Sequence, residues 1–206
     1  MIVVVDYGIG NLRSIQNMLH RAGVASEISG DTAMLRKASK LILPGVGHFG
    51  YAMDALRQRG LVEILNERVL EARTPVLGIC LGAQLLGRSS EEGSAEGLGW
   101  LAMDTIAFDR SRLGASDKIP HMGWAETRHT DQALFAGLKE PARFYLVHSY
   151  HFRCDSSSDV IATAHHGYDY PVAVGKGHIL GTQFHPEKSH VYGQQLLKNF
   201  AVMKFS

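Results

Sequence analysis

The residue with the clearest capacity for chemistry is a cysteine in a glycine-flanked turn. Cys80 lies in the segment Gly-Ile-Cys-Leu-Gly at 78–82, directly after the apolar run 76–79 and before the helix-like run 83–86. This order of strand, Gly-x-Cys-x-Gly and helix is that of a nucleophile elbow, with sulfur in place of oxygen. Glycines are needed there because a sharp turn brings backbone segments into close contact. The segment therefore predicts a nucleophilic thiol, although a cysteine in such a segment is also often a buried core residue.

The predicted elbow also supplies electrostatics that suit a thiolate. It places Cys80 at the N-terminal end of a helix, where the helix dipole and unpaired N–H groups favour the thiolate over the thiol. The N–H of Leu81 is predicted to point into the same space and to donate to an oxyanion. A glycine-rich turn at 44–50 ends another predicted strand. That turn either offers further backbone N–H groups to an anion or is a simple loop.

A base for this nucleophile is predicted near the C-terminal end of the chain. The segment His185-Pro186-Glu187 follows the strand-like residues 178–182. A catalytic histidine needs a partner that selects its tautomer and stabilises its cation, and a nearby carboxylate has the right chemistry. Pro186 restricts the backbone between the two side chains. We predict that His185 is the base and Glu187 its orienting partner, although a lone histidine here would more often be a surface or core residue.

Other patterns of chemically active residues are weaker. Gly8-x-Gly10 resembles the start of a dinucleotide fingerprint, but Arg13 stands where the third glycine belongs, so a tight turn is the better interpretation. Two histidine pairs, at 148 and 151 and at 165 and 166, have no acidic partner on a helix and belong to no Cys/His quartet. The sequence therefore predicts no metal site and no cofactor.

Composition narrows the class of protein. The 206 residues are enough for one well-formed core, so we predict a single domain over 1–206. With 45% hydrophobic and 20% charged residues, the chain is typical of soluble globular proteins, and a net charge of +1 without a basic run predicts no nucleic-acid or membrane partner. The strand-like N-terminal segment predicts no targeting leader or membrane span. Cys80 and Cys154 do not form a disulfide pattern, so we expect a cytoplasmic protein.

The first half alternates strand-like and helix-like segments. Strands are predicted at 2–5, 24–28, 40–43 and 76–79, and helices at 12–22, 53–69 with an interruption at Gly60, and 83–86. Such alternation indicates an open, mostly parallel sheet covered by helices. Sites in these sheets lie at the C-terminal ends of the strands. Gly8, the turn at 45–47 and Cys80 are all expected at that edge.

The second half is richer in strands. Strands are predicted within 98–108, at the aromatic-rich segment 144–152, and at 160–164, 172–174 and 178–182, with a polar loop at 109–117 and a short helix at 194–202. The prediction is an α/β fold: an open, mostly parallel twisted sheet flanked by helices, with an additional antiparallel portion in the C-terminal half.

Together these segments resemble the class I glutamine amidotransferases. The elbow and the distant His185-Pro186-Glu187 match the Cys-His-Glu pattern of that superfamily. Five segments resemble, more narrowly, the glutaminase subunits of imidazole glycerol phosphate synthase of histidine biosynthesis, at 6–12, 43–47, 120–124, 148–150 and 183–189. The resemblance runs from end to end. It departs at Ala83, where methionine is usual, and at Ala125, where asparagine is usual. The first departure should alter the packing of the elbow and the second the face toward a partner.

The resemblance implies a glutaminase reaction and assigns its residues. Cys80 would attack the side-chain carboxamide of glutamine, while His185, held by Glu187, moves the protons. The N–H of Leu81 and one from Val46-Gly47 would stabilise the oxyanion. The residues implied to hold the amino-acid end of glutamine are Gln84 and Glu92, with Glu91 as the neighbouring alternative to Glu92.

The resemblance also implies a partner that uses the ammonia. A (β/α)₈ barrel needs about 250 residues, so the cyclase would be a separate chain, and the two would form a heterodimer. We expect Met122, Trp124, Tyr150 and Lys188 on the docking face, since aromatic anchors dominate interface energetics; Trp124 is as readily a core residue. Because ammonia released without an acceptor is wasted, we also expect the oxyanion hole to be incomplete without the partner.

Three alternatives remain open at this level. The chain could serve another class I amidotransferase, such as one of pyridoxal phosphate or anthranilate synthesis, against which the segments 120–124 and 148–150 argue. It could be a catalytically silent regulatory subunit, but such a protein should lack a member of the triad. It could also be a cysteine hydrolase of esters or peptides, which only the resemblance disfavours.

Overall fold

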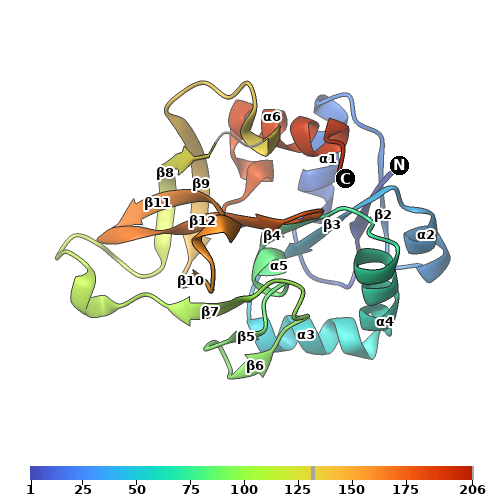
Figure 1. The fold of residues 1–206 in the computed structure, drawn as a ribbon. Coiled ribbons are helices and arrows are strands. Elements are labelled where there is room, and N and C mark those ends of the chain that lie inside the picture. The colour runs from blue at the N-terminus through green and yellow to red at the C-terminus, as the bar shows by residue number, and fades with distance from the viewer. Residues whose placement is uncertain (131–132, 206) are drawn as a thin grey trace.

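The computed structural model describes residues 1–130 and 133–205, and its main sheet joins a parallel half to an antiparallel half (Figure 1). Within these residues the strand order is β2-β1-β3-β4-β13-β12-β11-β8-β9. Pairs from β2 to β13 are parallel, and those from β13 to β9 are antiparallel. A smaller sheet has the order β10-β7-β5-β6. The predicted α/β fold with an antiparallel C-terminal portion is confirmed.

The bounds of the elements place each strand and helix on the chain. The main sheet contains β1 (Ile2–Val5), β2 (Ser26–Ser29), β3 (Lys40–Gly45), β4 (Val76–Cys80), β8 (His121–His129), β9 (Ala142–His148), β11 (Val160–His166), β12 (Tyr168–Lys176) and β13 (Ile179–Thr182). The smaller sheet contains β5 (Ser89–Ser90), β6 (Ala95–Glu96), β7 (Met103–Ala107) and β10 (Tyr150–Cys154). The α-helices are α1 (Leu12–Arg21), α2 (Thr32–Lys37), α3 (Phe49–Gln58), α4 (Leu61–Asn66), α5 (Leu81–Gln84) and α6 (His190–Val202). No helix in the described ranges combines the length and apolar character needed to cross a bilayer.

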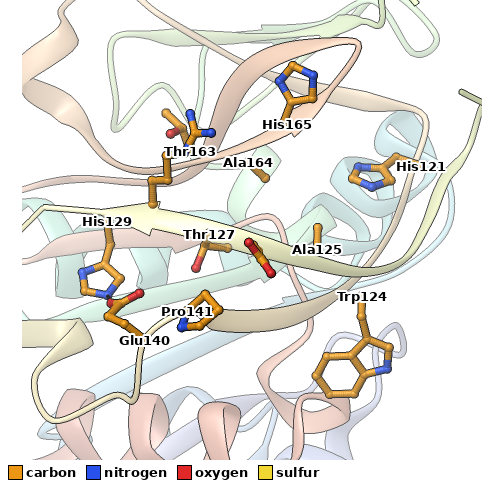
Figure 2. Close-up of a pocket in the computed structure, with 12 residues that line it drawn as sticks. His121, Trp124, Ala125, Thr127, His129, Glu140, Pro141, Thr163, Ala164 and His165 are labelled. Atoms are coloured by element: carbon orange, nitrogen blue, oxygen red, sulfur yellow. Dashed lines mark ion pairs between the residues drawn. The ribbon is translucent and has the colours of Figure 1, made fainter. Parts of the chain in front are cut away.

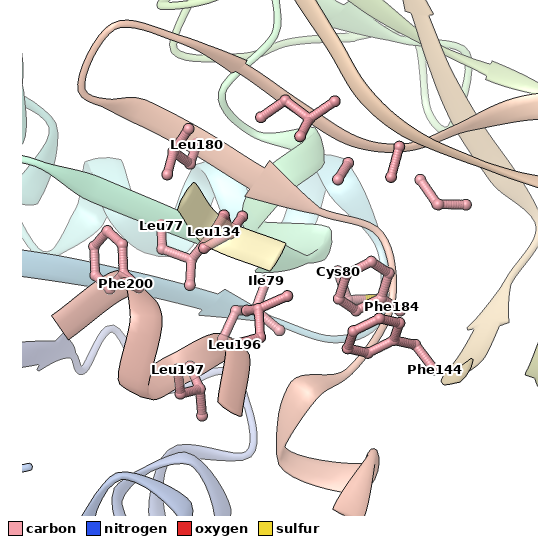
Figure 3. Packing of buried hydrophobic residues seen from close by; sticks show 14 of the residues in the cluster. Leu77, Ile79, Cys80, Leu134, Phe144, Leu180, Phe184, Leu196, Leu197 and Phe200 are labelled. Atoms are coloured by element: carbon pink, nitrogen blue, oxygen red, sulfur yellow. The ribbon is translucent and has the colours of Figure 1, made fainter. Parts of the chain in front are cut away.

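The parallel half is buried on both faces, which explains its continuous apolar strands. Alternate residues of β1 enter two different cores: Ile2 and Val4 pack with α1 and α6, whereas Val3 and Val5 pack with α2, α3 and α4. Figure 3 shows Leu196, Leu197 and Phe200 of α6 facing Leu77 and Ile79 of β4, with Cys80 at the end of the same strand. The site strand is thus held between two helical layers.

Several predicted elements differ from the structure, including the strand β8, which lies where no strand was expected. A short helix, α2, lies between β2 and β3, where two consecutive strands were expected; Asp31 caps it by accepting from Met34 N at 2.9 Å. The aromatic segment 144–152 is two strands rather than one, because the chain leaves the main sheet after His148 and enters the smaller sheet at Tyr150. The C-terminal helix begins at His190, four positions before the predicted start.

One cation, Lys40, connects the start of β3 to the C-terminal end of α6. Lys40, at the start of β3, donates through Nζ to the carbonyls of Phe200, Ala201 and Met203, each at 2.7 Å. These carbonyls lie at the C-terminal end of α6, where intrahelical donors are lacking and a positive charge is favourable. Lys40 therefore anchors the helix whose other end lies next to His185.

We predict that Lys40→Met lowers the free energy of unfolding by about 2 kcal/mol, because hydrogen bonds from a charged donor contribute roughly 1.5–3 kcal/mol. Urea unfolding of the purified chain measures the change. Lys37→Met, at an exposed position on α2, is the matched control and should change stability by less than about 0.5 kcal/mol. An equal loss in both variants would contradict the anchoring role.

Candidate active site

Cys80 stands at a sharp turn between β4 and α5, as predicted. Its backbone has φ 53° and ψ −113°, a conformation that residues with a side chain rarely adopt. The flanking glycines leave space for this turn: a Cβ on Gly78 would lie 2.6 Å from the Cα of Ala83, and one on Gly82 would overlap the Leu43 carbonyl. The helix differs from the prediction, since α5 begins at Leu81 and is one turn long. Its dipole therefore contributes little, and the charge at Cys80 depends on neighbouring side chains.

His185 is held next to Cys80 by its backbone and by its ring. Its N–H donates to the Tyr145 carbonyl at 2.9 Å, and its own carbonyl accepts from Ser189 Oγ at 2.6 Å. The ring donates from Nδ1 to Glu187 Oε1 at 2.8 Å, with both side chains buried. This hydrogen bond leaves Nε2 as the nitrogen available to Cys80. The spacing of two residues thus brings base and carboxylate into contact.

The charge state of His185 follows from these contacts. Burial lowers its pKa, but hydrogen bonds and charge interactions with Cys80 and Glu187 outweigh burial and raise the pKa to about 10. Burial raises the pKa of Glu187, but the hydrogen bond and charge of His185 together with the hydrogen bond from Asn11 outweigh burial, so the pKa lies below its ordinary value. An imidazolium next to Cys80 is a counter-charge for a thiolate. The arrangement suits a cysteine nucleophile with a histidine proton carrier.

Two residues of the site were missed by the sequence analysis. Asn11 donates from Nδ2 to Glu187 Oε1 at 3.0 Å, so it helps to orient the carboxylate. Gln183 donates from Nε2 to Cys80 Sγ at 3.7 Å and accepts from Gln84 Nε2 at 3.0 Å. Both lie inside segments that carry the family resemblance, at 6–12 and 183–189. In those segments the glycines and His185 are the residues that indicate a function, and neither amide is marked out. Only the fold brings these amides to the triad.

A cavity of about 490 Å³ opens in front of Cys80. It is lined by Asn11, Val46, Gly47, Cys80, Leu81, Gln84, Glu92, Pro120, Val147, His148, Ser149, Tyr150, His185 and Lys188. The structure therefore brings the predicted nucleophile, base, oxyanion-hole and glutamine-binding residues to one cavity, with Glu187 behind His185. Its volume lies within the range of small-molecule sites.

The turn after β3 lies beside the elbow, because β3 and β4 are neighbouring parallel strands. Gly45 is the register partner of Cys80, and a Cβ on Gly45 would lie 2.6 Å from the Gly82 N. The next residues differ in character, since Val46 is 37% exposed and Gly47 has φ 93°. Tyr7 anchors the start of this turn by donating to the Pro44 carbonyl at 2.6 Å. The turn thus has a fixed base and a tip that lines the cavity.

Glu92 and Glu91 have different positions, which separates the two alternatives. Glu92 lines the cavity and accepts from Phe49 N at 2.8 Å, at the start of α3. Glu91 accepts instead from Ala107 N at 2.8 Å, at the end of β7. Only Glu92 is placed to meet a ligand beside Cys80.

The predicted docking residues are divided between the cavity and the exposed surface of β8. Tyr150 and Lys188 line the cavity, whereas Met122 and Trp124 are exposed on β8, at 62% and 40%. Trp124 is therefore not a core residue. A second cavity of about 510 Å³ lies over β8 and β11, with Trp124 at its edge (Figure 2), and its described lining contains neither Cys80 nor His185. Within the described residues, no three His, Cys, Asp or Glu side chains are grouped as metal ligands.

Comparisons with known proteins agree with this geometry. The family model of class I glutamine amidotransferases matches residues 3–204. The chain belongs to this family. It is 45% identical over 201 residues to imidazole glycerol phosphate synthase subunit HisH 2 of Pseudomonas aeruginosa, covering 97% of this chain and 98% of that protein. It is 47% identical over 201 residues to subunit HisH of Sulfurimonas denitrificans, covering 97% of each.

Solved structures support the fold. A crystal structure described as a glutamine amidotransferase aligns with a TM-score of 0.69 at 23% identity, covering 96% of this chain and 99% of that chain. PurLQS from Thermotoga maritima aligns with a TM-score of 0.72 at 18% identity, covering 97% of this chain and 96% of that chain. At these identities the agreement concerns the architecture alone.

We predict that Glu187→Gln slows the alkylation of Cys80 by iodoacetamide at pH 7. The carboxylate helps to raise the pKa of His185, so the amide leaves less imidazolium to stabilise the thiolate. Mass spectrometry after timed labelling measures Cys80 and Cys154 separately. Cys154 is the internal control, because burial raises its pKa to about 11. An unchanged rate of Cys80 alkylation at pH 7 would show that Glu187 does not set the charge of His185.

Proposed function

We propose that this chain is the glutaminase subunit of an imidazole glycerol phosphate synthase in histidine biosynthesis. The observation that carries the proposal is the Cys80-His185-Glu187 constellation in one cavity with Gln84 and Glu92. Relatives that are 41–47% identical over almost the whole chain, and that bear the name of this subunit, support the choice within the family. The whole chain acts as one amidotransferase domain, in the cytoplasm, where its two free cysteines stay reduced.

The reaction uses the three side chains as a cysteine triad. Cys80 attacks the carboxamide carbon of glutamine, and His185 transfers a proton to the departing nitrogen, so that ammonia leaves and a thioester remains. Water, deprotonated by His185, then hydrolyses the thioester to glutamate and restores the thiol. Glu187 and Asn11 keep the ring of His185 in position. The oxyanion of each step is held by the N–H of Leu81 and by one from Val46-Gly47.

The α-ammonium group of glutamine is bound by a carboxylate and by the oxygen of an oriented amide. The nitrogen of Gln84 donates to Gln183 Oε1 and to the Tyr150 carbonyl, at 3.0 and 3.2 Å. Gln84 therefore presents its carbonyl oxygen to the cavity, an acceptor that suits the α-ammonium of glutamine. Glu92 supplies a carboxylate for the same group.

The partner is a separate cyclase that consumes the ammonia. The proposed docking face is formed by Met122, Trp124, Tyr150 and Lys188. Tyr145 links two of its members: the Trp124 ring lies 6.4 Å from that of Tyr145, and Lys188 Nζ lies 5.7 Å from the Tyr145 ring. The Trp124 ring also stacks on His190 at 5.4 Å. Because Lys188 lines the cavity, a partner seated on this face would also cover the mouth of the site.

We predict that Trp124→Ala and Lys188→Ala each weaken binding of the cyclase by roughly tenfold or more, since truncation of an interface anchor costs at least about 1–2 kcal/mol. Isothermal titration with the purified cyclase measures the change. Leu70→Ala is the control, because Leu70 is 51% exposed and lies at the opposite ends of the parallel strands, before β4 begins. Unchanged affinity in both test variants would place the interface elsewhere.

The decisive experiment for the function is glutamate release from glutamine by the purified chain, alone and with an equimolar cyclase that carries a substrate analogue. We expect a low rate alone and a rise of about 10²–10³ with the partner, because the exposed tip of the turn at Val46-Gly47 completes the oxyanion hole only in the complex. A high rate alone would retain the glutaminase and reject the gating. Absence of activity in both states, with folded protein and reduced Cys80, would favour a silent subunit or a different hydrolase.

A further inference from the structure

A buried group of histidines and tyrosines lies beside the cavity and takes no part in the triad. The rings of His148, His151, His166, Tyr168 and Tyr170 surround Phe108, with ring centroids 4.8–6.0 Å from its own. His121 joins the group by stacking on His166 at 4.1 Å. So many titratable rings in a core are costly unless each polar atom finds a partner. Their hydrogen bonds therefore determine what the group can do.

One chain of hydrogen bonds runs through His121, Tyr170 and His148 to the carbonyl of Tyr150. His148 Nδ1 lies 2.8 Å from that carbonyl, which can only accept, so Nδ1 carries the proton. His148 Nε2 then accepts from the Tyr170 hydroxyl at 3.1 Å. The hydroxyl oxygen in turn accepts from His121 Nδ1 at 2.8 Å. The direction of every donor is thus set by the fixed carbonyl.

The chain requires uncharged rings, and the surroundings keep them uncharged. Burial lowers the pKa of His148 to about 3 and that of His121 to about 4. Burial also raises the pKa of the Tyr170 hydroxyl above its usual range. At neutral pH each imidazole therefore has one donor and one acceptor nitrogen, as this chain needs.

The chain ends on the wall of the glutamine cavity. The Tyr150 carbonyl accepts from His148 Nδ1 and also from Gln84 Nε2, at 2.8 and 3.2 Å. Gln84 continues to Gln183 and from there to Cys80 Sγ. His148 and Tyr150 themselves line the cavity. A shift of the Tyr150 carbonyl would consequently change the orientation of the Gln84 amide.

The same cluster contains a second chain of the same design that does not reach the cavity. His151 donates from Nδ1 to the Phe152 carbonyl at 3.0 Å and accepts at Nε2 from the Tyr168 hydroxyl at 2.9 Å. Tyr168 accepts from Asp109 N at 3.0 Å. This series of hydrogen bonds ends at Phe152 in the smaller sheet, and Phe152 does not line the cavity. It provides an internal comparison for the first.

We propose that His148, Tyr170 and His121 are positioning residues, which orient Gln84 for the α-amino end of glutamine by fixing the Tyr150 carbonyl. The proposal rests on the proposed glutaminase function and adds a set of side chains to its binding site. The three residues affect the binding of glutamine, whereas the proton transfers between Cys80 and His185 do not pass through them.

The test is the Tyr170→Phe variant in complex with the cyclase. Loss of one hydroxyl leaves His148 Nε2 without its donor, so KM for glutamine should rise about three- to tenfold, as expected for one hydrogen bond. The value of kcat should change by less than about twofold, since binding of the ground state and the transition state is weakened equally. The rate of Cys80 alkylation by iodoacetamide should stay unchanged.

Tyr168→Phe is the matched control. It removes a hydroxyl from the second series of hydrogen bonds in the same cluster. Its loss of thermal stability should therefore be comparable to that of Tyr170→Phe, but KM for glutamine should not change. A second comparison uses two variants of His148. His148→Asn keeps a donor near the position of Nδ1, whereas His148→Leu has none. KM should rise less in the asparagine variant.

The positioning role would be overturned if KM for glutamine were the same in all variants as in the unmodified protein. So would an equal rise in Tyr168→Phe and Tyr170→Phe, since that result would indicate general loosening of the core. Absence of glutaminase activity in the unmodified complex would instead overturn the proposed function, so the two failures are distinguishable.

Discussion

The parallel pairing of β13 with β4 is the constraint on which the site depends. The register places Thr182 beside Ile79, so both strands deliver their next residues to the same edge of the sheet. Cys80 is the last residue of β4, at the elbow, and His185 follows β13 after two buried residues. Parallel strands share one direction, and so their C-terminal ends meet even though long stretches of chain separate them. Loss of this pairing would separate Cys80 from His185, its proposed base.

The site combines charged and uncharged histidines in one small protein, and burial acts differently on each. His185 is even more buried than His148, at 2% against 7% exposure. A carboxylate and a thiol partner raise the pKa of the first, whereas carbonyl and hydroxyl partners leave burial to lower the pKa of the second. The partner supplied by the fold therefore decides whether a buried imidazole is charged or neutral.

Local patterns determined much of the architecture. The β-branched run in β1 and the glycines around Cys80 predicted a buried strand and an elbow because each depends on sterics within a few residues. The contact between His185 and Glu187 is of the same kind, since two residues and one proline separate the side chains. The short helix α2 escaped prediction because its six residues have too little apolar periodicity, although Asp31 supplied the cap.

What the sequence determined by itself was chemistry and local shape: a thiol on a turn, an imidazole with its carboxylate, and the apolar strands of the parallel half. Tertiary structure alone decided which distant groups meet them. Asn11 reaches Glu187 and Gln183 reaches Cys80 only because the first, fourth and last parallel strands end at one edge. The division of the segment after His148 between two sheets is likewise a tertiary feature, and the rings of His148 and His151 on either side of it both pack on Phe108. An amide or a ring in a sequence has no partner until the chain is closed, since its hydrogen bonds are set by position in space.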